Sequence, residues 1–213
     1  MTRFLVVFDV DSTLIEDEVI ELLADAAGKR AEVAEVTERA MRGELDFADS
    51  LRQRVATLKG LDESVIAETL KRIKVTNGAQ QLIDSIHLAG GKVGAVSGGF
   101  NQLLAPLADR LNLDFWRANE LAIFDGKLLG EVSGQIIDRR AKSEALAEWA
   151  RECDLQTSKT IAVGDGANDL DMMAVAGLSI AFNAKPKVRQ EAQLVVAHQD
   201  LSELIPVLGL SSK

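Results

Sequence analysis

The sequence predicts an α/β protein in which a doubly wound parallel sheet carries an inserted helical cap and a small β-hairpin. Three observations lead to this fold class. An apolar strand pattern opens the chain at Phe4, helical patterns alone fill residues 16–74, and strand and helix patterns then alternate from Asn77 onward. Strands that alternate with helices form parallel sheets covered on both faces, whereas a long run of helices is not an ordinary crossover between strands.

The first strand pattern, Phe4–Phe8, is followed by two aspartates that stand two residues apart, Asp9 and Asp11. Alternate side chains of an extended backbone point the same way, so both carboxylates should leave the strand toward one small volume. Two carboxylates at such a short distance repel each other unless a cation or a proton neutralises part of their charge. We therefore expect a metal ion there. The alternative is that Asp11, Ser12 and Thr13 cap a helix while Asp9 belongs to a turn.

Helical periodicity dominates the segment that follows the first strand, with Gly28, Gly43, Gly60 and Asp62 separating successive patterns. The helices expected here are Glu16–Ala27, Arg30–Met41, Phe47–Leu58 and Glu63–Ile73. An ordinary crossover between parallel strands is a single helix. We therefore interpret residues 16–74 as a cap inserted into a core that comprises residues 1–15 and 75–213.

Within this core, the expected strands and helices alternate along the chain. They are the helices Asn77–Leu88, Asn101–Leu111, Ala141–Glu152 and Asp169–Ala176, and the strands Lys92–Ser97, Lys159–Val163, Leu178–Phe182 and Leu194–Val196. Asp125-Gly126 lies between two alternating apolar patterns and predicts a hairpin over about residues 118–133, because this dipeptide favours the tight turns that join antiparallel strands.

Composition disfavours several classes of partner. The 213 residues carry a net charge of -9, which leaves no basic surface for a nucleic-acid backbone. Cys153 is the only cysteine, so no internal disulfide can form, and with no secretory signal pattern at the start of the chain this favours the cytoplasm. The longest mostly apolar run, Met172–Phe182, is too short to span a bilayer. We therefore expect neither a nucleic acid nor a membrane as a partner.

The residues that directly follow each strand are the candidates for a functional site, because ligands of parallel α/β sheets bind at the carboxyl ends of the strands. One strand is followed by Ser97-Gly98-Gly99, and a later strand by Gly164-Asp165-Gly166 and then by Asn168 and Asp169. Lys142 falls in the first turn of a helix, where the dipole disfavours a cation, so a nearby anion would explain it. The structural alternatives are a tight turn for the glycines, an N-cap for Asp169 and a solvated surface position for Lys142.

Four segments occur in one order along the chain: DVDST, VSGG, Lys142 and GDGANDLDM. Together they resemble the signature of the haloacid dehalogenase superfamily of phosphotransferases. The stretches FDVDSTLIEDEVIELLA, MRGELDFADSLRQRV and VGDGANDLDMMAVAGLSIAF extend the resemblance over essentially the whole chain, to the branch that hydrolyses O-phosphoserine. The resemblance implies a Rossmann-like core and Mg²⁺-dependent hydrolysis of O-phosphoserine to serine and phosphate, the last step of serine biosynthesis.

The resemblance also implies roles for individual residues. Asp9 is expected to attack phosphorus and become an aspartyl phosphate, while Asp11 acts as general acid and then as general base. Mg²⁺ is expected to bind the side chains of Asp9 and Asp165 and the main-chain carbonyl of Asp11, with Asp169 nearby. The groups expected to hold the remaining phosphate oxygens are Ser97, the Gly98 amide and Lys142, and Asn168 is expected to help position the phosphoryl group or Lys142.

The cap is expected to choose the substrate. By resemblance, Glu18 and Arg54 match the residues that bind the amino acid end of O-phosphoserine, and Met41 and Phe47 match the apolar residues that close over it. Three functions remain open from the sequence. They are a hydrolase for O-phosphoserine, an enzyme that uses another small phosphomonoester or transfers the phosphoryl group to an acceptor such as homoserine, and a binding protein without catalysis. Every catalytic position holds a competent residue, which disfavours the last.

Overall fold

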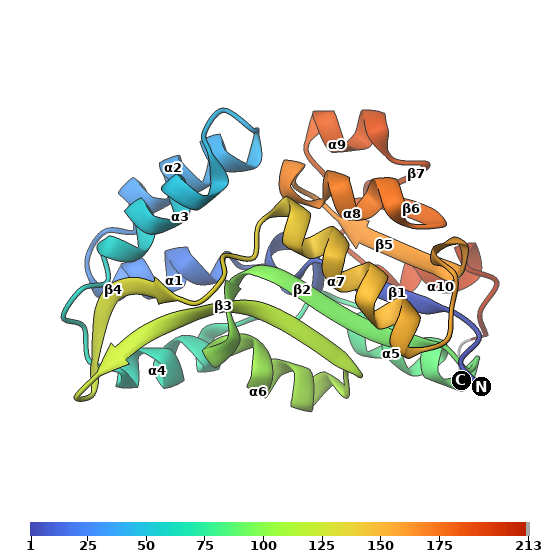
Figure 1. The fold of residues 1–213 in the computed structure, drawn as a ribbon, viewed down its shortest axis with the longest axis horizontal. Coiled ribbons are helices and arrows are strands. Elements are labelled where there is room, and N and C mark those ends of the chain that lie inside the picture. The colour runs from blue at the N-terminus through green and yellow to red at the C-terminus, as the bar shows by residue number, and fades with distance from the viewer. Residues whose placement is uncertain (212–213) are drawn as a thin grey trace.

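A computed structural model describes residues 1–211, which form a seven-stranded sheet with helices on both faces (Figure 1). The strands lie in the order β4-β3-β2-β1-β5-β6-β7. Their bounds are β1 Leu5–Phe8, β2 Lys92–Phe100, β3 Phe115–Phe124, β4 Lys127–Ser133, β5 Thr160–Gly164, β6 Leu178–Phe182 and β7 Leu194–Val196. Each neighbouring pair is parallel except β3 and β4, which form an antiparallel hairpin.

The helices follow the expected alternation with small changes at their ends. They are α1 Val19–Ala26, α2 Arg30–Met41, α3 Phe47–Ala56, α4 Ser64–Arg72, α5 Ala79–Leu88, α6 Asn101–Leu111, α7 Arg139–Glu152, α8 Leu170–Val175, α9 Pro186–Glu191 and α10 Leu204–Val207. Short 3₁₀ turns lie at Thr157–Lys159, Ala167–Asp169 and Leu201–Glu203. Within residues 1–211, every helix falls short of the length and apolar character that crossing a membrane requires.

The predicted parallel sheet and hairpin are both present, and the hairpin is continuous with the sheet. The first half of β3 pairs with β2 in parallel, with Gly94 opposite Phe115 and Val96 opposite Arg117. Its second half pairs with β4 in antiparallel register, with Ile123 opposite Leu128. The sheet is therefore mixed.

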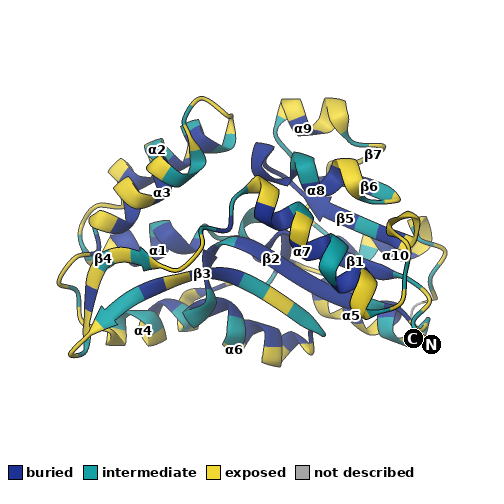
Figure 2. Cartoon of the chain, in the orientation of Figure 1, coloured by how far each residue is buried: buried dark blue, intermediate teal, exposed yellow. Residues whose placement is uncertain are grey.

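Side chains of β1 alternate between two apolar cores, one on each face of the sheet. Val6 and Phe8 join the core beneath α5 and α6, whereas Leu5 and Val7 join the core beneath α7 and α8. All four side chains are fully buried. Figure 2 shows the buried strands at the centre of the molecule and the exposed outer faces of the helices. This two-sided burial holds the carboxyl end of β1 in a fixed place.

Helices α1 to α4 lie together beyond the carboxyl end of the parallel strands (Figure 1). The chain enters and leaves this helical segment at one point, where Ile15 pairs with Val75. Backbone hydrogen bonds from Glu16 N to Lys74 O (2.9 Å) and from Thr76 N to Leu14 O (3.0 Å) join the two connections. The segment also touches the hairpin, where the Gly60 amide donates to Leu128 O (2.8 Å).

Candidate active site

The turn that follows β1 places two aspartates at the carboxyl end of the sheet. Residues Val10–Leu14 form a wide turn, η1, in which Ser12 adopts a left-handed conformation with φ of 57°. Asp9 is buried, and Asp11 is bound on both carboxylate oxygens. The Val19 amide donates to Oδ1 (2.7 Å) and the Ser97 hydroxyl to Oδ2 (2.9 Å). Asp11 therefore joins the β1 turn to the first helix of the cap and to the end of β2.

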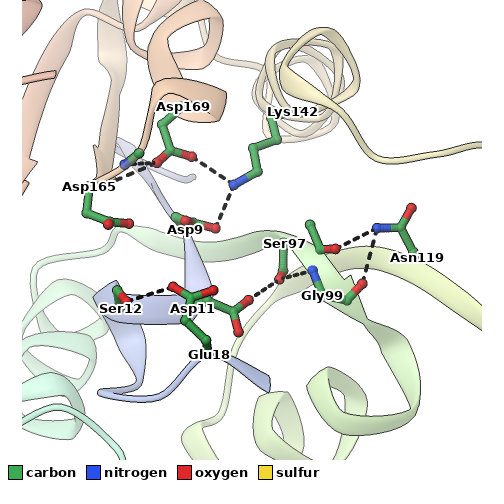
Figure 3. A network of polar contacts seen from close by, with 12 residues as sticks. Asp9, Asp11, Ser12, Glu18, Ser97, Gly99, Asn119, Lys142, Asp165 and Asp169 are labelled. Atoms are coloured by element: carbon green, nitrogen blue, oxygen red, sulfur yellow. Dashed lines mark hydrogen bonds and ion pairs between the residues drawn. The ribbon is translucent and has the colours of Figure 1, made fainter. Parts of the chain in front are cut away.

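Lys142 connects two of the site's acids. Its Nζ lies 2.6 Å from Asp9 Oδ1 and 2.8 Å from Asp169 Oδ1, and all three side chains are buried (Figure 3). Asp138 caps helix α7 and thereby fixes the turn that carries Lys142, because its carboxylate accepts the Ala141 amide (2.9 Å). Burial lowers the pKa of Lys142, but Asp169 and Asp9 raise that pKa more, so the lysine stays cationic. Two anions thus explain a cation in the first turn of a helix.

Three buried aspartates converge in this region from the turns that follow the neighbouring strands β1 and β5. Asp9, Asp165 and Asp169 each offer a carboxylate oxygen, and these oxygens lie within 4.8 Å of one another. Burial, with repulsion from Asp169, raises the pKa of Asp9 to about 7, and burial together with Asp9 and Asp169 raises the pKa of Asp165 well above its usual value. Lys142 balances one of the three negative charges. The donor set and the remaining charge of the cluster fit a divalent cation, which prefers carboxylate oxygens.

Asp169 also fixes the turn that carries Asp165. Its Oδ2 accepts the backbone amides of Asp165 (3.2 Å) and Gly166 (3.1 Å), while its Oδ1 accepts Lys142. A Cβ at Gly164 would overlap the Asp169 carboxylate, so this position needs glycine. Both Asp169 oxygens are therefore engaged by the protein, and the side chain orients Asp165 and Lys142.

The Ser97-Gly98-Gly99 segment at the end of β2 is held by an asparagine that the sequence analysis did not identify. The Ser97 hydroxyl accepts the Gly99 amide (2.7 Å) while it donates to Asp11. Asn119 Nδ2 donates to the carbonyls of Gly98 (2.8 Å) and Gly99 (3.2 Å), and its Oδ1 accepts the Ile137 amide (2.8 Å), as Figure 3 shows for the glycines. Asn119 thus sets the orientation of the peptide that holds Ser97.

The cap supplies one wall of a cavity over these acids. The residues that line the cavity are Asp9, Asp11, Glu18, Val19, Ile20, Met41, Phe47, Gly98, Gly99, Asp165 and Asn168. The volume of the cavity that the centre of a water molecule can occupy is about 20 Å³. This is enough for one water molecule. The cavity in this conformation therefore has no room for an organic molecule.

Two charged cap residues occupy different places around the cavity. Glu18 lines it and accepts the Ser12 hydroxyl (2.8 Å), and burial together with Asp11 raises the pKa of Glu18 to about 8. Arg54 is buried between helices α2 and α3 and is not among the lining residues. Burial lowers the pKa of Arg54, while Glu18, Asp11 and Glu21 raise it. Glu18 thus faces the cavity directly, whereas Arg54 lies in the helices around it.

A buried acid next to a lysine, at the end of the first strand of an α/β sheet and under a helical cap, is the arrangement of a phosphoryl-transfer site. The chain matches the family model of the haloacid dehalogenase-like hydrolases over residues 6–174, and it belongs to this family. Among its relatives are phosphoserine phosphatases. It is 50% identical to the phosphoserine phosphatase of Streptococcus thermophilus over 204 residues, which are 96% of this chain and 95% of the relative.

Other relatives are longer than this chain. It is 49% identical to a phosphoserine phosphatase of Mycobacterium tuberculosis over 99% of its own residues, but it spans only 51% of that relative. Among solved structures, a substrate-bound phosphoserine phosphatase complex superposes with a TM-score of 0.94 at 40% identity, and the match covers 97% of this chain and 99% of that one. A phospho-aspartyl intermediate analogue of phosphoserine phosphatase matches to the same extent.

Proposed function

We propose that this chain hydrolyses O-phosphoserine to serine and inorganic phosphate in the cytoplasm. The observation that carries the proposal is the buried Asp9, tied to Lys142 and set beside Asp11, beneath a cap that carries the half-buried Glu18 and the buried Arg54. The first three groups suit attack on a phosphate monoester, and the last two suit the ammonium and carboxylate of an amino acid. The relatives named phosphoserine phosphatase support this choice of substrate.

The reaction takes place in two displacements at phosphorus. A carboxylate oxygen of Asp9 forms a bond to phosphorus as the bond from phosphorus to the serine oxygen breaks, and Asp11 gives its proton to that oxygen. Asp11 then takes a proton from a water molecule, whose oxygen attacks the aspartyl phosphate and releases phosphate and the free Asp9 carboxylate. Burial raises the pKa of Asp11, although the Val19 amide and Ser97 lower it, and the net rise helps Asp11 to hold the first proton.

Lys142 and the Ser97 segment serve the charged phosphate group. Lys142 fixes the Asp9 carboxylate through Oδ1 and favours its ionised, nucleophilic form. Ser97, the Gly98 amide, Lys142 and Asn168 are our candidates to bind phosphate oxygens, where negative charge accumulates in the transition state. Asn168 Oδ1 is buried without a hydrogen-bond partner among residues 1–211, which fits a side chain that awaits a ligand or a water molecule.

A divalent cation fits the aspartate cluster, and we propose Mg²⁺. Asp9, Asp165 and the main-chain carbonyl of Asp11 would hold it, with Asp169 orienting Asp165. Bound there, Mg²⁺ would offset the negative charge of the phosphate group and of the carboxylates. Glu18 would bind the substrate ammonium and Arg54 its carboxylate, while Met41 and Phe47 would cover the substrate within a cap of residues 16–74.

A phosphate-release screen tests the proposed function. The purified protein with Mg²⁺ is given O-phosphoserine, other small phosphomonoesters and p-nitrophenyl phosphate, and O-phosphoserine should give the highest kcat/KM. Glu18→Gln and Arg54→Ala should each lower kcat/KM for O-phosphoserine, with a loss of transition-state stabilisation of about 2 kcal/mol or more. Each substitution leaves a charged group of the substrate unpaired in a closed site. For p-nitrophenyl phosphate, which has neither group, the losses should be much smaller. Equal losses on both substrates would argue against O-phosphoserine.

A further inference from the structure

Arg54 is held in the cap entirely by uncharged oxygens. Its exposed fraction is 4%, and its three hydrogen bonds within residues 1–211 go to the Ser50 carbonyl, the Ser50 hydroxyl and the Thr37 hydroxyl. A guanidinium that is buried without an anion is unfavourable, because burial removes its hydration. The observed contacts therefore fix the position of the cation, while Glu18, Asp11 and Glu21 act on its charge only from a distance, without an ion pair to it among residues 1–211.

The donors that remain free on Arg54 match a carboxylate. A guanidinium has five N–H groups. Nε donates to the Ser50 carbonyl (3.0 Å), Nη1 to Thr37 Oγ1 (3.0 Å) and Nη2 to Ser50 Oγ (3.5 Å). Each terminal nitrogen keeps one N–H that these three hydrogen bonds do not use, and two N–H groups of a guanidinium can donate to the two oxygens of one carboxylate. The direction in which this pair points depends on the oxygens that hold the other three donors.

Thr37 is unusual for its place on helix α2. The buried residues of α2 are Val33, Thr37 and Ala40, which share one face at helical spacing, and Thr37 is 3% exposed. Valine has the shape of threonine and would fill this core position without a polar group to satisfy. The hydroxyl accepts Arg54 Nη1 across the contact between α2 and α3. Its hydrogen-bond partner within residues 1–211 is thus the cation, whereas packing alone would not require a hydroxyl.

Ser50 accepts the other two hydrogen bonds from Arg54. It lies one turn before Arg54 on α3, where its hydroxyl donates to the Phe47 carbonyl (2.8 Å) and accepts Arg54 Nη2. Both of its contacts to Arg54 come from the same helix, so by themselves they fix the guanidinium only relative to α3. Thr37 adds the constraint from a second helix.

We propose that Thr37 is a positioning residue for substrate specificity, because its hydroxyl aims the free N–H pair of Arg54 at the carboxylate of an amino acid substrate. This inference rests on the proposed function and deepens it. Thr37 itself does not touch the substrate. Its loss should therefore weaken recognition of the carboxylate and leave the chemistry at phosphorus unchanged.

The test compares Thr37→Val, which keeps the shape and removes the hydroxyl, with Thr37→Ser, which keeps the hydroxyl, and with Arg54→Ala. O-phosphoserine and O-phosphoethanolamine are the informative substrates, since they differ only in the carboxylate, and p-nitrophenyl phosphate reports on folding and on the phosphate chemistry. Thr37→Val should lower kcat/KM for O-phosphoserine about tenfold, mainly through KM, as expected for a weakened hydrogen bond to a charged group. Its kcat/KM for the other two substrates should stay within about twofold, and Thr37→Ser should retain the selectivity of the unmodified protein.

Each other outcome decides a different question. If Thr37→Val keeps the full preference for O-phosphoserine while Arg54→Ala loses it, the role of Thr37 is refuted and the proposed function stands. If Thr37→Val loses activity equally on all three substrates, or if Thr37→Ser does so, Thr37 supports the cap generally and the inference is also refuted. If the unmodified protein turns over p-nitrophenyl phosphate but not O-phosphoserine, the proposed function itself fails and the inference falls with it.

Discussion

Phe47 packs so closely on Gly98 that a single added methyl group should disfavour this position of the Phe47 ring. A Cβ at Gly98 would lie 2.6 Å from Cζ of Phe47, 3.2 Å from Cε2 and 3.8 Å from Cε1. Carbon atoms in contact prefer about 3.5–4.0 Å, so in Gly98→Ala the ring must retreat by about 1 Å. The backbone at Gly98 is not in the left-handed region, so alanine adds no strain of its own.

The size of the effect follows from the cost of overpacking. Inserting a methyl group into a packed contact costs about 1–3 kcal/mol, which here falls on the closed state. If the substrate reacts only under a closed cap, kcat/KM for O-phosphoserine should fall about 5- to 160-fold in Gly98→Ala. Phosphate release under conditions of low substrate measures this ratio directly.

A second substitution separates the cap contact from damage to the phosphate segment. The three atoms that a Cβ at Gly98 would meet are outer ring atoms of Phe47, and Phe47→Leu lacks them. In the Phe47→Leu background, Gly98→Ala should therefore lower kcat/KM less than about threefold further. If Gly98→Ala loses the same factor in both backgrounds, its effect arises at the phosphate-binding segment and the reasoning about the cap is refuted.

Three further predictions concern the proposed nucleophile, the proposed metal and Asp114, which directly precedes β3. Asp9→Asn should abolish steady-state phosphate release, since an amide cannot accept the phosphoryl group, while circular dichroism shows a folded protein; substantial turnover would remove Asp9 as the nucleophile. Ca²⁺ should inhibit in competition with Mg²⁺, because it accepts bidentate carboxylates and would occupy both Asp9 oxygens; equal turnover with either ion would contradict this. Burial raises the pKa of Asp114, but hydrogen bonds from Lys92, the Val93 amide and His87 lower it more, so the net shift is downward. The carboxylate therefore stabilises the fold above its unfolded pKa of about 3.9 and loses this effect as the pH falls through the lower folded value. In urea unfolding, Asp114→Asn should be less stable than the unmodified protein at pH 7, and the difference should shrink below about pH 4; a difference that does not change with pH would contradict the assignment.

The sequence predicted those parts of the fold and site that have local patterns. Asp9 and Asp11 follow an apolar strand directly, so strand periodicity alone brings them to one end of the sheet. Lys142 lies 133 residues from Asp9 in sequence, and no spacing rule joins them. Its role was predicted only because the four segments together resemble a known family.

The elements that were missed have weak local patterns. Helix α9 has one buried apolar residue, Val188, and so lacks an apolar stripe, although Pro186 at its first position is a typical start signal. Asn119 and Thr37 are polar residues at buried positions, and periodicity assigns such residues to the solvent side. Their partners, the Gly98 carbonyl and the Arg54 guanidinium, come from other elements. Such contacts are set by tertiary packing.

The pairing of Ile15 with Val75 also bears on how the chain can change during evolution. Because the two ends of residues 16–74 are already joined, the sheet meets this segment as a closed loop, and lengthening or rebuilding it adds little loop-closure entropy. Asp9, Asp165 and Lys142 lie outside the loop, whereas Glu18, Thr37 and Arg54 lie inside it. Under the proposed function, substitutions inside the loop would change which leaving group binds, while the residues proposed for the chemistry at phosphorus would stay as they are.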